Sequence, residues 1–103
     1  MLTAQAIEDF KVFIDRTIAY AKVTINGTES KQIIHRRERL ADGRVAIYLQ
    51  ITPGSNSAVT IQKVRLYNTD NQLWAEKNED IKLSGAQEGA LYRFVFGFEE
   101  MEV

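Results

Sequence analysis

The spacing of apolar residues changes once along this chain, near residue 19, and this change constrains the fold more than any other feature. Before it, apolar residues recur every three or four positions, as they do on one face of a helix. After it, they alternate with polar residues, as they do on one face of a strand. The sequence therefore predicts one amphipathic helix over about residues 3–18, followed by strands from about residue 19 to residue 103.

The N-terminal helix is predicted to carry one apolar stripe, whose members are Ile7, Phe10, Ile14, Ile18 and Ala21. Thr3 precedes this stripe and can serve as the N-cap, because its hydroxyl can accept a hydrogen bond from a free backbone N–H of the first turn. Two heptads are too short to form a coiled coil alone. We therefore expect the stripe to pack on the strands, with self-association through the helix as the alternative.

Turn signals divide the rest of the chain into strands. Asn26-Gly27 and Asp42-Gly43 are residue pairs typical of tight hairpin turns. The alternation is clearest over residues 45–51, whereas residues 30–40 are mostly polar and basic and are interpreted as one exposed edge strand. A later strand changes its phase, which predicts a β-bulge near Gln62-Lys63.

These segments predict the fold class. The chain is expected to be mainly β, a small antiparallel β-sandwich or curled sheet preceded by one N-terminal amphipathic helix. Strands that are adjacent in the sequence are expected to pair. The 103 residues, 45% of them hydrophobic, suit one core, so a single domain over residues 1–103 is predicted. No stretch is long and apolar enough to span a bilayer.

Composition argues against several kinds of chemistry. The chain has no Cys and a single His, His35. Thiolate chemistry, zinc–thiolate sites and a Ser-His-acid triad are therefore not indicated, and we predict no catalytic residue, no cofactor, no metal and no enzymatic activity. The net charge of -1 provides no overall attraction to nucleic acid. Acids stand where a signal peptide would carry basic residues, so the cytoplasm is the expected location.

The densest basic cluster lies between residues 35 and 44. Arg36, Arg37 and Arg39 form its centre and could contact an anion or a nucleic acid. In a strand, however, Arg37 and Arg39 point to the face opposite Arg36, and charges of this kind also protect an edge strand from aggregation. We interpret the cluster as a solvated edge whose arginines are candidate interaction residues, and we do not expect nucleic-acid binding.

Aromatic side chains offer a different kind of site. Trp74 and Tyr67 lie near a polar turn, and together with Tyr48 they could form stacking platforms for a carbohydrate. Such residues also close the ends of β-sandwiches. The aromatic row of the last strand is expected to lie in the core, and its members are Tyr92, Phe94, Phe96 and Phe98.

One segment carries a resemblance. Residues 64–77 read Val-Arg-Leu-Tyr-Asn-Thr-Asp-Asn-Gln-Leu-Trp-Ala-Glu-Lys, with a predicted turn at residues 68–71, and residues 87–94 read Gln-Glu-Gly-Ala-Leu-Tyr-Arg-Phe. They resemble small structural proteins encoded in the tail regions of Gram-positive phages and prophages, in which a VxLYDxxGxLWA hairpin recurs. Asn71 and Gln72 stand where that pattern prefers Asp or Gly. The resemblance implies a role in assembly or adhesion and carries no catalytic residue.

The residues and the resemblance together predict a non-enzymatic structural or protein-interaction module, phage-derived and tail-associated, in the cytoplasm or on a virion. Its partner would be another protein or a second copy bound through the N-terminal helix, and no membrane is expected. The alternative is a small ligand-binding β-sandwich of the carbohydrate-binding type. The candidate interaction residues are Ile7, Phe10, Ile14, Arg36, Arg37, Arg39, Tyr67 and Trp74.

Overall fold

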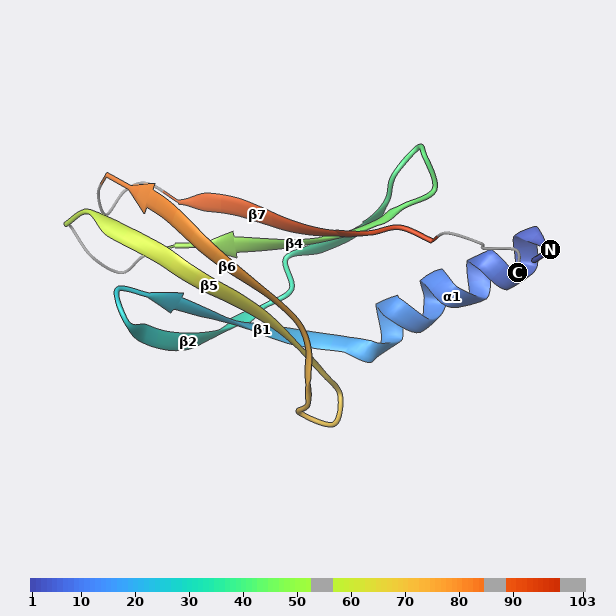
Figure 1. Cartoon of the computed structure of the whole chain (residues 1–103), viewed down its shortest axis with the longest axis horizontal. Coiled ribbons are helices and arrows are strands. Elements are labelled where there is room, and N and C mark those ends of the chain that lie inside the picture. The colour runs from blue at the N-terminus through green and yellow to red at the C-terminus, as the bar shows by residue number, and fades with distance from the viewer. Residues whose placement is uncertain (53–56, 85–88, 99–103) are drawn as a thin grey trace.

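The change in apolar spacing coincides with a change from helix to strand in the computed structural model of the chain (Figure 1). The structure describes residues 1–52, 57–84 and 89–98. Within these residues the elements are α1 (Ala4–Thr17), β1 (Ile18–Ile25), β2 (Thr28–Ile33), β3 (Arg36–Arg39), β4 (Val45–Ile51), β5 (Val59–Asn68), β6 (Leu73–Leu83) and β7 (Ala90–Phe96). The fold is therefore mainly β with one N-terminal helix, as predicted. The last five residues of the predicted strand region, 99–103, lie outside the described residues.

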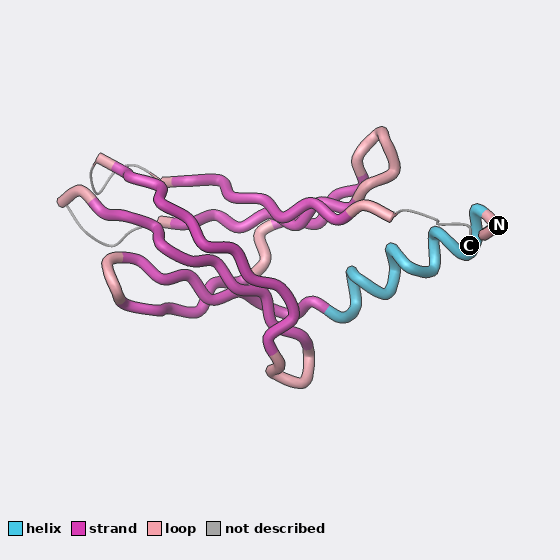
Figure 2. The backbone as a smooth tube through the Cα atoms, in the orientation of Figure 1, coloured by secondary structure: helices cyan, strands magenta, loops and turns pink. Residues whose placement is uncertain are grey.

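The strands form two antiparallel sheets that face each other (Figure 2). One sheet has the strand order β2-β1-β5-β6, and the other has the order β3-β4-β7. Strands adjacent in the sequence pair in three places, β1 with β2, β3 with β4 and β5 with β6. The expectation that all neighbours pair is wrong elsewhere, because β5 returns to pair with β1 and β7 returns to pair with β4. These two long-range pairings separate the strands into two sheets.

The core fills the space between the sheets, because strands β1, β4, β5 and β7 turn apolar side chains inward. Burying these side chains removes their apolar surface from water, which is the main favourable contribution to folding. Tyr92 and Phe94 are buried, whereas Phe98 is 37% exposed, so the aromatic row of the last strand leaves the core toward its end. The side chains with less than 2% exposure are Ile18, Ile47, Leu49, Ile51, Ile61, Leu66, Val23, Val45 and Val64.

The structure confirms the predicted helix cap, one predicted turn and the predicted bulge, each of which depends on residues close together in the sequence. The hydroxyl of Thr3 accepts a hydrogen bond from the backbone N–H of Ala6 at 3.2 Å, so Thr3 caps α1. Asn26 and Gly27 have φ angles of 48° and 82° and connect β1 to β2. The register of β5 against β6 shifts between Ile61 and Lys63, at the predicted bulge.

Two predicted boundaries are wrong. Residues 30–40 do not form one edge strand, because β2 belongs to the four-stranded sheet and β3 to the three-stranded sheet. The chain crosses between the sheets at Ile34, which packs against the core. The helical stripe does not extend to Ile18 and Ala21 either. Both residues lie in β1, because pairing with β5 buries their side chains between the sheets.

A partly buried hydroxyl links β6 to β7 across the two sheets. Tyr92 on β7 donates a hydrogen bond to the carboxylate of Glu79 on β6. Burial raises the pKa of the Tyr92 hydroxyl, and the hydrogen bond to Glu79 raises it further. The hydroxyl therefore keeps its proton in the folded chain at a pH where a free tyrosine loses it.

The raised pKa of Tyr92 predicts a loss of stability at high pH. Because the pKa in the folded state lies above the ordinary value of 10.0, the stabilisation is complete below that pH and declines as the pH rises past it. We expect Tyr92→Phe to remove this pH dependence. The wild-type chain should then lose on the order of 1 kcal/mol of its free energy of unfolding, relative to the variant, between about pH 9 and about pH 11. Urea unfolding of the wild type and the variant at several pH values measures this change. Free energies of unfolding that fall in parallel with pH would contradict the prediction.

Candidate interaction surfaces

Helix α1 extends beyond the sandwich at one end of the molecule (Figure 1). It continues directly into β1, since Ile18 is both the C-cap of the helix and the first residue of the strand. Ile14 is the only buried residue of α1. A helix that buries one side chain leaves most of its surface exposed, so α1 is the first place to look for an interaction surface.

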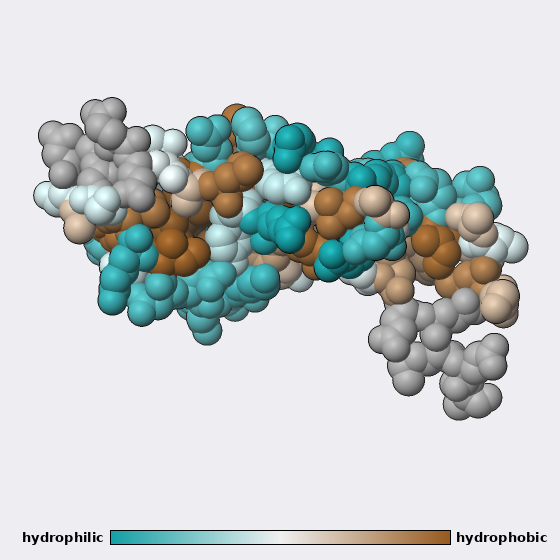
Figure 3. Space-filling view, turned by 90° about the horizontal axis from the view of Figure 1, so that it is seen from above, coloured by the Kyte–Doolittle hydropathy of each residue, from teal (hydrophilic) through white to brown (hydrophobic). Residues whose placement is uncertain are grey.

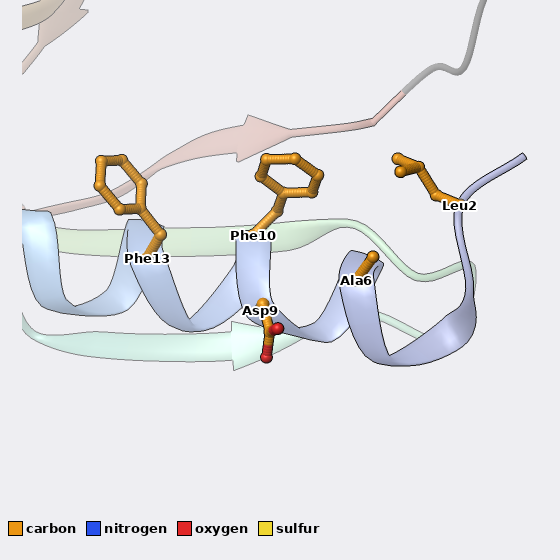
Figure 4. Close-up of a pocket in the computed structure, with 5 residues that line it drawn as sticks. All are labelled: Leu2, Ala6, Asp9, Phe10 and Phe13. Carbon is orange, nitrogen blue, oxygen red and sulfur yellow. The ribbon is translucent and has the colours of Figure 1, made fainter.

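One side of α1 carries exposed apolar side chains. Leu2, Ala6, Phe10 and Phe13, with Asp9 at the margin, line an open hollow of about 490 Å³. Figure 4 shows Leu2, Phe10 and Phe13 pointing to the same side of the helix while Asp9 points away from the rings. Phe10 is 47% exposed and Phe13 is 57% exposed. We call Ala6, Phe10 and Phe13, with the flanking carboxylate of Asp9, the helix stripe.

The opposite side of α1 packs on the sandwich. Ile14 is 5% exposed and belongs to the core. Ile7 and Lys11 line a second hollow together with the loop at residues 42–44 and with Phe98. Of the helical residues predicted to interact, Ile7 and Ile14 therefore face the body of the protein, whereas Phe10 stacks on Phe98 with 6.0 Å between the ring centroids and remains half exposed.

Two arginines of β3 hold the helix against the sheets. The guanidinium of Arg37 donates to the backbone carbonyls of Asp15 at 2.8 Å and of Ile18 at 2.6 Å. These carbonyls lie at the C-terminal end of α1, where helical backbone acceptors lack partners within the helix. Arg39 forms ion pairs with Glu8 at 2.7 Å and with Asp15 at 3.1 Å. The side chains of Arg37 and Arg39 therefore both make contacts within the chain.

Arg36 points to the other face of its strand, as the alternation predicts. Its guanidinium lies 4.4 Å from the centroid of the Tyr48 ring and 3.2 Å from the carboxylate of Glu38. The arginines predicted as one interaction group therefore face two different surfaces. His35 uses its backbone N–H to bond the carbonyl of Tyr48 at 2.8 Å. The positive charges of this segment are largely matched by carboxylates and ring faces of the same chain.

The three aromatic residues proposed as sugar platforms lie on different surfaces. Tyr48 is 8% exposed and lies beneath Arg36. Trp74 is 36% exposed and packs edge-on against Phe96, with 5.4 Å between the ring centroids. Tyr67 points outward from the four-stranded sheet. Because the rings do not converge, they do not form one binding platform.

A second surface, the outer face of the four-stranded sheet, was not predicted from the sequence. Its central feature is the pair Tyr20 and Tyr67, whose rings stack at 5.2 Å with an angle of 3° between their planes. The strand register extends this row to Ile33 on β2 and to Leu73 on β6. Ile33 is 80% exposed and Leu73 is 48% exposed. We call this row of Ile33, Tyr20, Tyr67 and Leu73, with the neighbouring row of charges, the tyrosine face.

The neighbouring row of the tyrosine face is basic. Lys31, Lys22 and Arg65 lie opposite one another on β2, β1 and β5. Glu76 continues the row on β6 and bonds Arg65 at 3.0 Å. That hydrogen bond, with help from Lys63, lowers the pKa of the Glu76 carboxyl. The alternation of polar residues in each strand signals an exposed face, but only the strand order brings these cations together.

Across the described residues, no group of three or more His, Cys, Asp or Glu side chains could hold a metal ion. No helix in the same part of the chain is long and apolar enough to cross a membrane. The chain matches no protein-family model, and comparison with curated proteins and with solved structures also finds no match. The function must therefore be inferred from the surfaces of the molecule.

Proposed function

We propose that this protein is a non-enzymatic interaction module that assembles through the helix stripe. The observation that supports this most directly is the exposure of Phe10 and Phe13 on a helix that the sandwich leaves largely uncovered. Figure 3 shows hydrophobic side chains gathered at the end of the molecule where α1 lies. Exposed apolar clusters rimmed by polar residues are typical of protein–protein contacts.

The energetics favour burial of this stripe in a complex. Burying one phenylalanine side chain contributes about 1.5–3 kcal/mol, and aromatic anchors are common among the residues that dominate binding energy. The ion pairs of Arg39 fix the helix before any partner arrives. A surface that is already ordered loses little conformational entropy on binding.

The biological setting that we propose is a phage or prophage assembly, in the cytoplasm or on the virion. The support for this finer proposal is the resemblance of residues 64–77 to tail-associated proteins, a segment that forms the β5–β6 hairpin. Capsid or tail genes beside the gene for this chain would strengthen it, and metabolic neighbours would count against it. The carbohydrate-binding alternative has no comparable support, because Tyr48, Tyr67 and Trp74 lie on separate surfaces.

Light scattering tests the assembly. We expect the mass of the wild-type chain to rise with concentration above that of one 11.8 kDa chain. Phe13→Asp should abolish this rise, because it places a charge in the helix stripe. Ala4→Asp is the matched control, because Ala4 is exposed, lies about two and a half turns from Phe13 and so on the opposite side of the helix, and the substitution adds the same charge. A wild-type chain that stays monomeric at every concentration would overturn the proposal.

A further inference from the structure

One row of the tyrosine face brings like charges together on neighbouring strands. Lys22 lies directly opposite Lys31 on one side and Arg65 on the other. Like charges opposite each other on neighbouring strands destabilise a sheet. Arg65 is compensated by Glu76 at 3.0 Å and by Glu29 at 3.5 Å. Within the described part of the chain, neither lysine forms an ion pair, so this row retains excess positive charge.

The tyrosine rings do not offer open stacking surfaces. Tyr20 and Tyr67 cover each other, and the ammonium groups of Lys31 and Lys22 lie 4.4 and 5.0 Å from their ring centroids. A base or a sugar ring needs a free aromatic face on which to stack. The row instead ends in two exposed aliphatic side chains, Ile33 and Leu73. This mixture of aliphatic ends, ring edges and cations suits an apolar protein surface that carries carboxylates.

The helix stripe is such a surface. Its apolar members are Ala6, Phe10 and Phe13, and the carboxylate of Asp9 lies at its margin. Asp9 accepts a hydrogen bond from Gln5 at 2.8 Å, and among the described residues its carboxylate forms no ion pair, although Arg16 lines a hollow with it beside Phe13. In such a contact the apolar side chains of the two surfaces would pack together, Asp9 would meet the lysines of the basic row, and Arg16 would meet Glu76 at the end of that row. The two surfaces therefore complement each other in both hydrophobicity and charge.

The dimensions of the two surfaces also match. The row across four strands spans three inter-strand spacings, or about 14 Å. Along α1, Ala6 and Phe13 are separated by about 10 Å, since each residue of a helix advances about 1.5 Å. The full apolar part of the helix stripe therefore fits within the width of the sheet.

We propose that the helix stripe of one copy of this chain packs on the tyrosine face of a second copy. This inference rests on the proposed function, because it names the partner of the helix stripe. The two surfaces are different parts of the same chain, so the contact is head-to-tail. Repetition of such a contact produces a closed ring or an open filament rather than a two-fold dimer.

Mixing two variants tests this directly. Phe13→Asp destroys the helix stripe but leaves the tyrosine face, and Ile33→Asp places a charge in the tyrosine face but leaves the helix stripe. Both positions are exposed, at 57% and 80%, so both variants should fold. Each variant alone should be monomeric by analytical ultracentrifugation. An equimolar mixture should form a species of twice 11.8 kDa, because one intact stripe and one intact face remain.

The other outcomes separate this inference from the proposed function. If Phe13→Asp is monomeric but Ile33→Asp assembles like the wild type, the helix stripe binds itself, and the inference fails while the proposed function stands. A mixture that stays monomeric also overturns the inference. If a labelled single-stranded oligonucleotide binds the wild type, blocks its assembly and does not bind a Lys22→Glu chain, the face belongs to nucleic acid. A wild-type chain that never assembles overturns both proposals.

Discussion

Ile14→Ala is expected to lower the free energy of unfolding by about 2–4 kcal/mol. Ile14 is 5% exposed and belongs to the hydrophobic core, where it is the only buried residue of α1. Shortening it removes apolar contacts and leaves a cavity where the helix meets the two sheets. Urea unfolding followed by circular dichroism measures the change.

The adjacent residue is the control for this prediction. Phe13 is 57% exposed, so Phe13→Ala should change the free energy of unfolding by less than about 0.5 kcal/mol. The same substitution should weaken assembly, because it removes a ring from the helix stripe. Equal losses of stability at positions 13 and 14 would show that the helix is packed differently from this structure.

Arg37→Ala is expected to cost about 1.5–3 kcal/mol, the typical value of hydrogen bonds to a charged donor. Its guanidinium bonds two carbonyls, those of Asp15 and Ile18, at the junction of α1 and β1. Hydrogen exchange should reveal where the loss occurs. The amides of α1 should exchange faster in Arg37→Ala, whereas those of the central strand β5 should change only as far as global stability changes.

Two further variants sharpen the test of Arg37. Arg37→Lys should restore only part of the stability, because a lysine ammonium does not reproduce the planar fork that reaches both carbonyls. Arg44→Ala should cost less than about 0.5 kcal/mol, since Arg44 is exposed and its side chain bonds Asp42 two residues away. If Arg44→Ala and Arg37→Ala show the same amide hydrogen exchange in α1 and the same free energy of unfolding, β3 does not anchor the helix.

Both predictions bear on function through the same junction. A helix anchored by Ile14 and Arg37 presents the helix stripe in a fixed orientation relative to the sheets. In a head-to-tail contact, that orientation sets the angle between successive copies and hence decides between a ring and a filament. Loosening Arg37 should therefore broaden the distribution of assembled species.

The candidate interaction residues were only partly predictable. Periodicity identified α1 as amphipathic, but the apolar residues extend over a wide arc of the helix. The sandwich covers the part with Ile14 and leaves the part with Phe13 exposed. Periodicity reports that a face is apolar, not which element covers it. The basic cluster was visible as well, but Arg37 turned out to bond the helix end rather than face a partner.

The features that depend only on neighbouring residues could be predicted from the sequence. Thr3 caps the helix because its hydroxyl reaches Ala6, and Asn26 and Gly27 turn the chain because they tolerate positive φ. Which strands pair depends instead on the packing of the whole chain. Lys22 and Arg65 become neighbours only when β5 pairs with β1, a contact between residues far apart in the chain. Many alternative pairings would bury similar apolar rows, so packing of the whole core selects one of them.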